Sequence, residues 1–197
     1  MKKTTTLWSI IMICGLVITL AGCFQTTPVR QYVLITEPIP KALENNSEAM
    51  TILIGPVKLA NYLDQSRIVR RHGPTRIDSL TGHQWAGDLT EMISHKLIAE
   101  LGGLLKPAQV LAYPGTAGQG RRVAIDILRF EGTDDKNAII EANWTIFDLE
   151  SKMRIKTQSS LIQVLLSDDS FETLTTALSQ GLTQLGQEMA ASIVMQQ

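Results

Sequence analysis

The stretch RRVAIDILRFEGTDDKNAIIEANWTIFDL, residues 121–149, contains two alternating apolar runs separated by a polar turn at 131–136. The first run places Val123, Ile125 and Ile127 on one face, and Asp126, Leu128 and Phe130 on the other face. In the second run, Ile140, Trp144 and Ile146 share a face. A third strand is expected over 154–166. Three consecutive long strands with short connections predict an antiparallel meander.

The rest of the chain supplies further strands and two helices. Short β-rich runs occupy 32–35, 50–57, 66–71 and 75–80. Apolar residues at steps of three and four predict an amphipathic helix over 85–101, ended by Gly102-Gly103. The order is therefore about four strands, a helix, three strands and a final helix. This order predicts a sheet with helices packed on it, without giving the strand order.

The final helix has a long apolar stripe and is expected to be capped by Ser167-Asp168-Asp169. The stripe consists of Phe171, Leu174, Leu178, Leu182, Leu185, Met189 and Ile193. Such a stripe most often packs on the sheet of its own domain. A coiled-coil or partner helix is the alternative, because the spacing is sustained over several turns.

The amino terminus has the three parts of a secretory signal: Lys2 and Lys3, an apolar run, and a small-residue cleavage site. The site, Leu20-Ala21-Gly22-Cys23, resembles the bacterial lipobox. That resemblance implies a diacylglycerol on the Cys23 thiol, cleavage before Cys23, and an N-acyl chain on the new terminus. Phe24, in place of Asp, implies sorting to the outer membrane. We therefore expect a signal peptide at 1–22, a lipidated cysteine and tether at 23–49, and one domain at 50–197.

Charge and cysteine content exclude several classes of protein. Removal of residues 1–22 takes away Lys2 and Lys3 and no acidic residue, so the mature chain carries a net charge of about −3. No basic excess is present, so a nucleic-acid partner is not expected. Cys14 leaves with the signal, and an intrachain disulfide is therefore excluded for the mature chain.

Motifs for catalysis or metal binding are absent from the sequence. His72, His83 and His95 form no ligand pair. The glycine-rich loop at 115–120 lacks the flanking lysine and helix of a phosphate loop, and no nucleophile elbow occurs. We therefore expect no enzyme, no metal and no cofactor beyond the acyl chains on Cys23.

The segment GPVKLANYLDQSRIVRR, residues 55–71, resembles the signature of the ABC-type transport auxiliary lipoproteins, the PqiC/YmbA group. The stretches 126–132 and 142–145 fit the same pattern. The resemblance implies an α/β fold, a three-layer α/β/α sandwich with a mixed, partly antiparallel sheet like the TolB amino-terminal domain. It also implies a lipoprotein on the periplasmic face of the outer membrane that works with an MCE-domain protein in lipid transport. Ala60-Asn61 departs from the family pattern and leaves the shape of the 58–62 loop open.

The sequence therefore favours an outer-membrane-anchored accessory lipoprotein that acts by docking. We expect the partner-binding surface at Tyr62, Leu63, Arg67, Arg70 and Arg71, since tyrosine and arginine are favoured at protein contacts. The arginines could instead form a solvated strand edge. Two other functions stay open. One is a lipid-binding periplasmic carrier, and the other is a structural envelope lipoprotein that self-assembles as a homo-oligomer.

Overall fold

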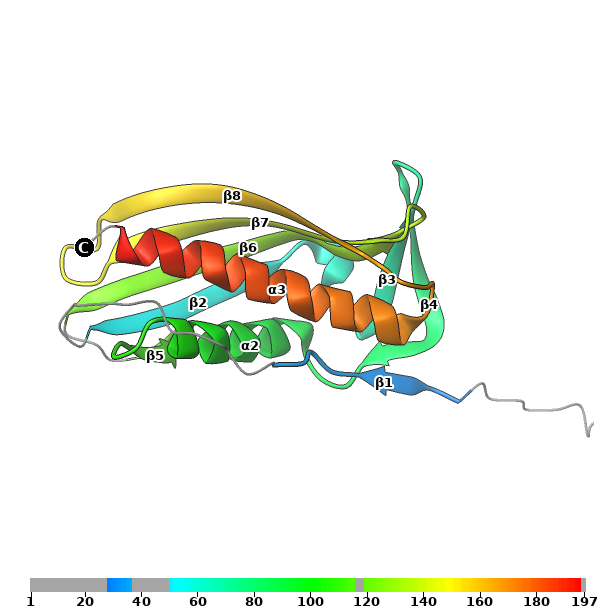
Figure 1. Ribbon diagram of the computed structural model, residues 1–197, viewed down its shortest axis with the longest axis horizontal. Coiled ribbons are helices and arrows are strands. Elements are labelled where there is room, and N and C mark those ends of the chain that lie inside the picture. Colours follow the sequence, from blue (N-terminus) through cyan, green and yellow to red (C-terminus); the bar gives the residue numbers. More distant parts are fainter. Residues whose placement is uncertain (1–27, 37–49, 116–118, 196–197) are drawn as a thin grey trace, which may run out of the picture.

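A computed structural model describes residues 28–36, 50–115 and 119–195, which form one sheet and two α-helices (Figure 1). The strands are β1 (Arg30–Tyr32), β2 (Thr51–Leu59), β3 (Arg67–His72), β4 (Arg76–Trp85), β5 (Gln109–Ala112), β6 (Gly120–Thr133), β7 (Asn137–Asp148) and β8 (Arg154–Leu165). The helices are the 3-10 turn η1 (Asn61–Leu63), α2 (Leu89–Leu104) and α3 (Phe171–Val194).

The predicted meander forms one side of the sheet, with β8 at its edge. β6 pairs antiparallel with β7 along its length, and β7 pairs antiparallel with β8. The other edge of β6 is shared, since its first half pairs parallel with β2 and its last residues pair parallel with β3. On its other side β2 pairs with β5. β3 pairs with β4, and β4 pairs with β1. The result is an eight-stranded mixed sheet, so the predicted α/β class and partly antiparallel sheet are confirmed.

Both helices cover the same face of the sheet. α2 and α3 lie side by side in Figure 1 and pack directly on each other, with Thr183 Oγ1 of α3 donating to Glu100 Oε1 of α2 at 2.7 Å. The sheet therefore cannot lie between them. Within the described residues there is one helical layer on one sheet, which corrects the third layer of the predicted α/β/α sandwich.

A β-bulge in β6 changes the predicted facing of one residue. The register with β7 shifts between Ile127 and Arg129. As a result Phe130 joins Ile125 and Ile127 in the core and is only 2% exposed, whereas strict alternation places it with Asp126 on the other face. The extra residue in the bulged strand reverses the order of inward and outward side chains beyond it.

The helix ends also differ slightly from the predicted ones. α2 begins at Leu89 with Asp88 as its N-cap, and it continues through Gly102-Gly103 to Leu104. Ser170 caps α3, because its side chain accepts from the Thr173 amide. The short strand β5 was not predicted, since its four residues are mostly exposed and show little alternation.

The apolar stripe of α3 packs inside the domain. Leu174, Leu178, Leu182, Leu185 and Met189 are all fully buried. The packing interpretation of this helix is therefore confirmed, and the stripe is not available to a coiled-coil partner. No helix within the described part of the chain is long and apolar enough to cross a membrane.

The amino-terminal strand lies earlier than predicted and belongs to the folded domain. β1 covers Arg30–Tyr32 instead of 32–35, and it pairs parallel with the end of β4. Residues 28–36 are thus part of the domain, although the sequence placed them in the tether. The predicted signal peptide at 1–22 and the predicted lipidation site, Cys23, lie outside the described residues.

Candidate functional site

A buried carboxylate on the face of the sheet opposite α2 and α3 organises the candidate site. Glu131 lies near the end of β6. The residue before it, Phe130, is buried in the core, and a Cβ added at the residue after it, Gly132, would lie 3.0 Å from Leu174 of α3. Glu131 therefore points away from the helices. Its side chain is nevertheless 0% exposed, because neighbouring side chains cover it.

Three side chains from different elements surround Glu131. Arg71 of β3 donates through Nε to Glu131 Oε1 and through Nη2 to Oε2, the latter at 3.3 Å. Arg129 of β6 donates through Nε to Oε1 at 2.9 Å. The Tyr62 hydroxyl of η1 donates to Oε2 at 2.8 Å and lies within 3.1 Å of the Leu128 carbonyl oxygen. We call Tyr62, Arg71, Arg129 and Glu131 the Glu131 cluster.

The hydrogen bonds of the cluster determine its protonation. Burial acts to raise the pKa of Glu131, but hydrogen bonds from Arg71, Arg129 and Tyr62 together lower it below the ordinary value. Burial, followed by the hydrogen bond to Glu131, raises the pKa of Tyr62 to about 12. At neutral pH the cluster therefore holds a carboxylate, two guanidinium groups and a neutral phenol.

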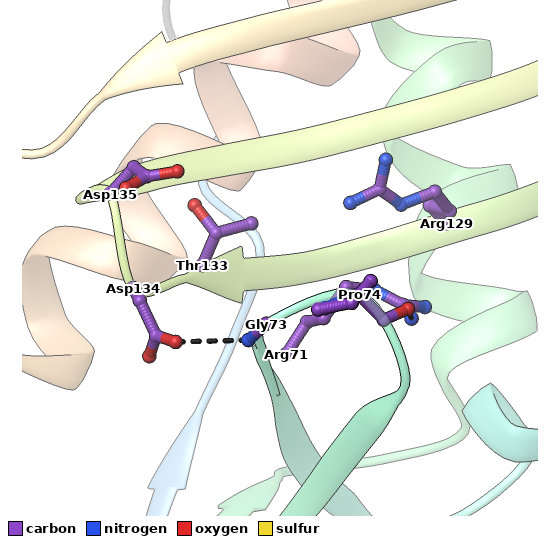
Figure 2. A pocket seen from close by; sticks show the side chains of 7 residues that line it. All are labelled: Arg71, Gly73, Pro74, Arg129, Thr133, Asp134 and Asp135. Atoms are coloured by element: carbon purple, nitrogen blue, oxygen red, sulfur yellow. Dashed lines mark hydrogen bonds between the residues drawn. The ribbon is translucent and has the colours of Figure 1, made fainter.

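An open hollow of about 530 Å³ adjoins the cluster (Figure 2). The hairpin between β3 and β4 forms one wall with Arg71, Gly73 and Pro74, and β6 with its following turn forms the other. Asp134 Oδ2 accepts from the Gly73 amide at 3.0 Å and joins the two walls. The remaining lining residues are Arg129, Thr133 and Asp135. The hollow is thus polar and carries charges of both signs.

The five predicted partner-binding residues do not lie together on one surface. Tyr62 and Arg71 come together in the Glu131 cluster, and Arg67 is exposed at the start of β3. Leu63 is only 2% exposed and packs in the core, so it cannot contribute to a surface. Arg70 points to the helical side, where its guanidinium lies 4.9 Å from the centre of the Phe171 ring.

Two residues of the cluster were not predicted as site residues. Arg129 and Glu131 lie in the stretch DILRFEG, which the sequence comparison to the family pattern already contained. Two opposite charges two residues apart in a strand, with other arginines far away in the sequence, only weakly indicate a buried ion pair. Their meeting depends on the bulge in β6 and on the pairing of β3 with β6.

The arrangement fits recognition better than catalysis. A carboxylate with a lowered pKa and three donors is a poor general base. The described residues contain no group of three or more histidine, cysteine or acidic side chains that could hold a metal. What the cluster does provide is two arginines fixed beside a hollow, and pre-organised arginine forks suit contacts with acidic or polar groups of a partner.

Comparison with known proteins gives a family and a fold. The model of the family described as ABC-type transport auxiliary lipoprotein component matches residues 32–190. A search of curated protein sequences gave no match.

Solved structures share the fold at low sequence identity. An uncharacterised protein superposes with a TM-score of 0.73 at 16% identity, covering 84% of this chain and 99% of that one. Protein XCC0632 from Xanthomonas campestris gives 0.69 at 20% identity, with 87% and 96% covered. The hypothetical protein CT253 from Chlamydia trachomatis gives 0.50 at 12% identity, with 75% and 96% covered.

Proposed function

The chain belongs to the family of ABC-type transport auxiliary lipoprotein components, and we propose that it is an outer-membrane accessory that docks an MCE-domain protein. In this proposal, acyl chains on Cys23 hold the protein on the periplasmic face of the membrane. The domain then contributes a contact surface to a lipid transport system and carries out no chemistry of its own.

The observation that carries the docking surface is the pair of arginines held by the buried Glu131. A buried carboxylate fixes both guanidinium groups in place, so little side-chain entropy is lost when a partner binds there. Arg67 extends the same strand and is exposed. The proposed surface therefore consists of Arg67, Arg71, Arg129 and the rim of the hollow.

The other two functions receive less support from the described residues. An acyl-chain carrier needs an apolar cavity, whereas the hollow beside the cluster is lined by arginines, aspartates and a threonine. Self-assembly through the closing helix needs a free apolar stripe, and that of α3 is buried against the sheet and α2.

In-cell crosslinking tests the proposal directly. The lipidated chain is crosslinked in its own cell envelope, recovered, and its partners are identified by mass spectrometry. We expect an MCE-domain protein with the wild type and a severalfold lower yield with Arg67→Glu/Arg129→Ala, which leaves the Arg71–Glu131 pair intact. Arg154→Glu, an exposed arginine at the start of β8, is the matched control.

The outcomes separate the function from the surface. Failure of the wild type to capture any MCE-domain protein would overturn the proposed function. Equal capture by the wild type and the double variant would leave the function standing and rule out this surface. Thermal melting of each variant shows whether a loss of capture reflects unfolding.

A further inference from the structure

A strip of exposed aliphatic side chains follows the predicted lipid anchor. In β1 and the residues that follow it, Tyr32 is buried in the core and Leu34 packs against the core. The alternate residues Val29, Val33 and Ile35 are 54%, 59% and 45% exposed. We call these three side chains the apolar strip. Together these three side chains expose a small apolar surface close in sequence to the predicted anchor.

The strip is a fixed part of the domain surface. β1 pairs with β4, and the Tyr32 hydroxyl lies 2.8 Å from His83 Nδ1. Further along, the Ile35 amide donates to Ser179 Oγ of α3 at 3.0 Å, and Lys96 Nζ of α2 donates to the Ile35 carbonyl oxygen at 2.6 Å. The strip is therefore bound across the helical layer and cannot move freely with the preceding chain.

The distance from the anchor to the strip is short. Only six residue steps separate Cys23 from Val29. A fully extended chain covers about 3.5 Å per residue, so the two lie at most about 21 Å apart. If Cys23 carries acyl chains, as the proposed function requires, the strip is always within reach of the membrane surface.

We propose that the apolar strip lies on the lipid bilayer and orients the domain on the membrane. Aliphatic side chains suit the boundary between the acyl chains and the head groups of a bilayer. Arg30, next to Val29 in the chain, is 67% exposed while its Nη1 lies 3.7 Å from Glu172 Oε1, and the long side chain of an arginine can reach the head groups beside such a surface. Three half-exposed side chains are far fewer than the 20 to 30 residues that a stable protein interface uses on each side. A bilayer held nearby by the anchor fits the strip better than a second copy of the chain.

This orientation has a consequence for the candidate site. The strip lies on the helical side through its contacts with Lys96 and Ser179, whereas the Glu131 cluster lies on the opposite face of the sheet. With the strip on the membrane, Arg71 and Arg129 face away from the lipid. The hollow beside them is then accessible to a partner in the periplasm.

Fluorescence quenching by lipid tests this proposal. The lipidated protein is placed in vesicles of phosphatidylethanolamine and phosphatidylglycerol, some lipids carrying a quencher in the acyl region. A thiol-reactive fluorophore is attached at Gln31→Cys, within the strip, or at Ser159→Cys, exposed on the opposite face. Labelling is selective because the thiol of Cys23 is blocked by its acylglycerol.

We expect quenching to be at least threefold stronger at position 31 than at position 159. The triple variant Val29→Thr/Val33→Thr/Ile35→Thr should remove most of that difference while its melting temperature stays close to that of the wild type. Equal quenching at the two positions would overturn the proposal. The proposal would also be overturned if the label at position 31 were shielded from water only when many protein molecules are present per vesicle. That result would indicate that a second copy of the chain covers the strip. Capture of the MCE-domain protein is a separate measurement, so failure here leaves the proposed function intact.

Discussion

Arg71 and Glu131 form a two-point ion pair that joins β3 to the end of β6. The Nε and Nη2 atoms of Arg71 each donate to a different oxygen of the buried carboxylate. β3 and β6 are otherwise paired only at Arg70 with Gly132 and Arg71 with Thr133. The ion pair therefore reinforces a short parallel contact at which the β3–β4 hairpin meets the meander.

Replacement of Arg71 should weaken this contact measurably. Arg71→Ala leaves Glu131 buried with only two of its three partners, and we expect a loss of about 1–3 kcal/mol in the free energy of unfolding. Urea denaturation of the Cys23→Ala mature chain measures the loss. Arg67→Ala is the control, since a change at an exposed position should stay within about 0.5 kcal/mol. Equal effects of the two variants would contradict a structural role for the ion pair.

Stability should fall with acidification, in part through Glu131. Its pKa in the folded state is lower than its ordinary value of 4.5, because the hydrogen bonds from Arg71, Arg129 and Tyr62 outweigh burial. The unfolded chain therefore takes up a proton first as the pH falls. The contribution of Glu131 to the free energy of unfolding is fully present above about pH 4.5. It is lost as the pH drops through the pKa of Glu131 in the folded state.

Glu131→Gln isolates this contribution. The free energy of unfolding of the wild type, measured by urea denaturation from pH 7 down to pH 3, should decline more steeply below pH 4.5 than that of the variant. The variant is expected to be less stable at pH 7, since its amide lacks the charge that the arginines bind. Parallel pH profiles for the two proteins would show that other carboxyl groups account for the acid sensitivity.

The meander could be predicted from sequence because each strand is long and one of its faces is buried. The position of the bulge could not be predicted, since nothing in DILRFEG distinguishes Leu128 from its neighbours as the residue that leaves the register. That bulge places Phe130 in the core and Glu131 on the opposite face. The two arginines around Glu131 were therefore only partly predictable. Arg71 could be predicted as a site residue because it lies in the segment 55–71 that resembles the family signature. The role of Arg129 could not be predicted, because it depends on how the strands pair in the fold.

Tether length was overestimated for a similar reason. The three residues of β1 are too few to show a period, and their pairing with β4 lies more than fifty positions away in sequence. The prolines and asparagines that follow indicate a loop. They carry no information about Ile35, whose amide and carbonyl groups bond to side chains of α3 and α2.

The buried pair of Lys96 and Glu100 should be sensitive to removal of one partner only. Both side chains are almost fully buried between α2 and α3, with Lys96 Nζ at 2.7 Å from Glu100 Oε1. Lys96→Met leaves an uncompensated carboxylate and is expected to cost about 3–5 kcal/mol. Lys96→Met/Glu100→Met removes both charges and should be less destabilised than the single variant. Thermal and urea unfolding of both proteins tests this order, and a double variant weaker than the single one would contradict it.

A hydrogen-bond chain in the core should respond to the loss of one hydroxyl group. Trp144 Nε1 donates to Ser160 Oγ at 3.0 Å, and Ser160 Oγ in turn donates to Glu188 of α3. Ser160→Ala leaves the indole N–H buried without this acceptor, at an expected cost of about 1–3 kcal/mol. The neighbouring exposed Ser159→Ala should change stability by less than about 0.5 kcal/mol. Near-ultraviolet circular dichroism of Trp144 gives a second measurement, since the indole environment changes only in the first variant.

Gly120 should tolerate no side chain where β6 begins. Its φ is +150°, and an added Cβ would lie 1.9 Å from the Thr51 carbonyl oxygen of β2. This neighbour is backbone in the parallel pairing of β2 with β6, so Gly120→Ala must displace one strand from the other. We expect a loss of about 3 kcal/mol or more in the free energy of unfolding.

Gly73→Ala is the matched control for that prediction. Gly73 also has a positive φ, of +60°, but no heavy atom lies within 4 Å of its added Cβ. Only the backbone preference is lost there, which should cost about 1–2 kcal/mol. Urea denaturation separates the steric effect from the conformational one. If the two variants lose equal stability, close packing between β2 and Gly120 is not what requires glycine at position 120.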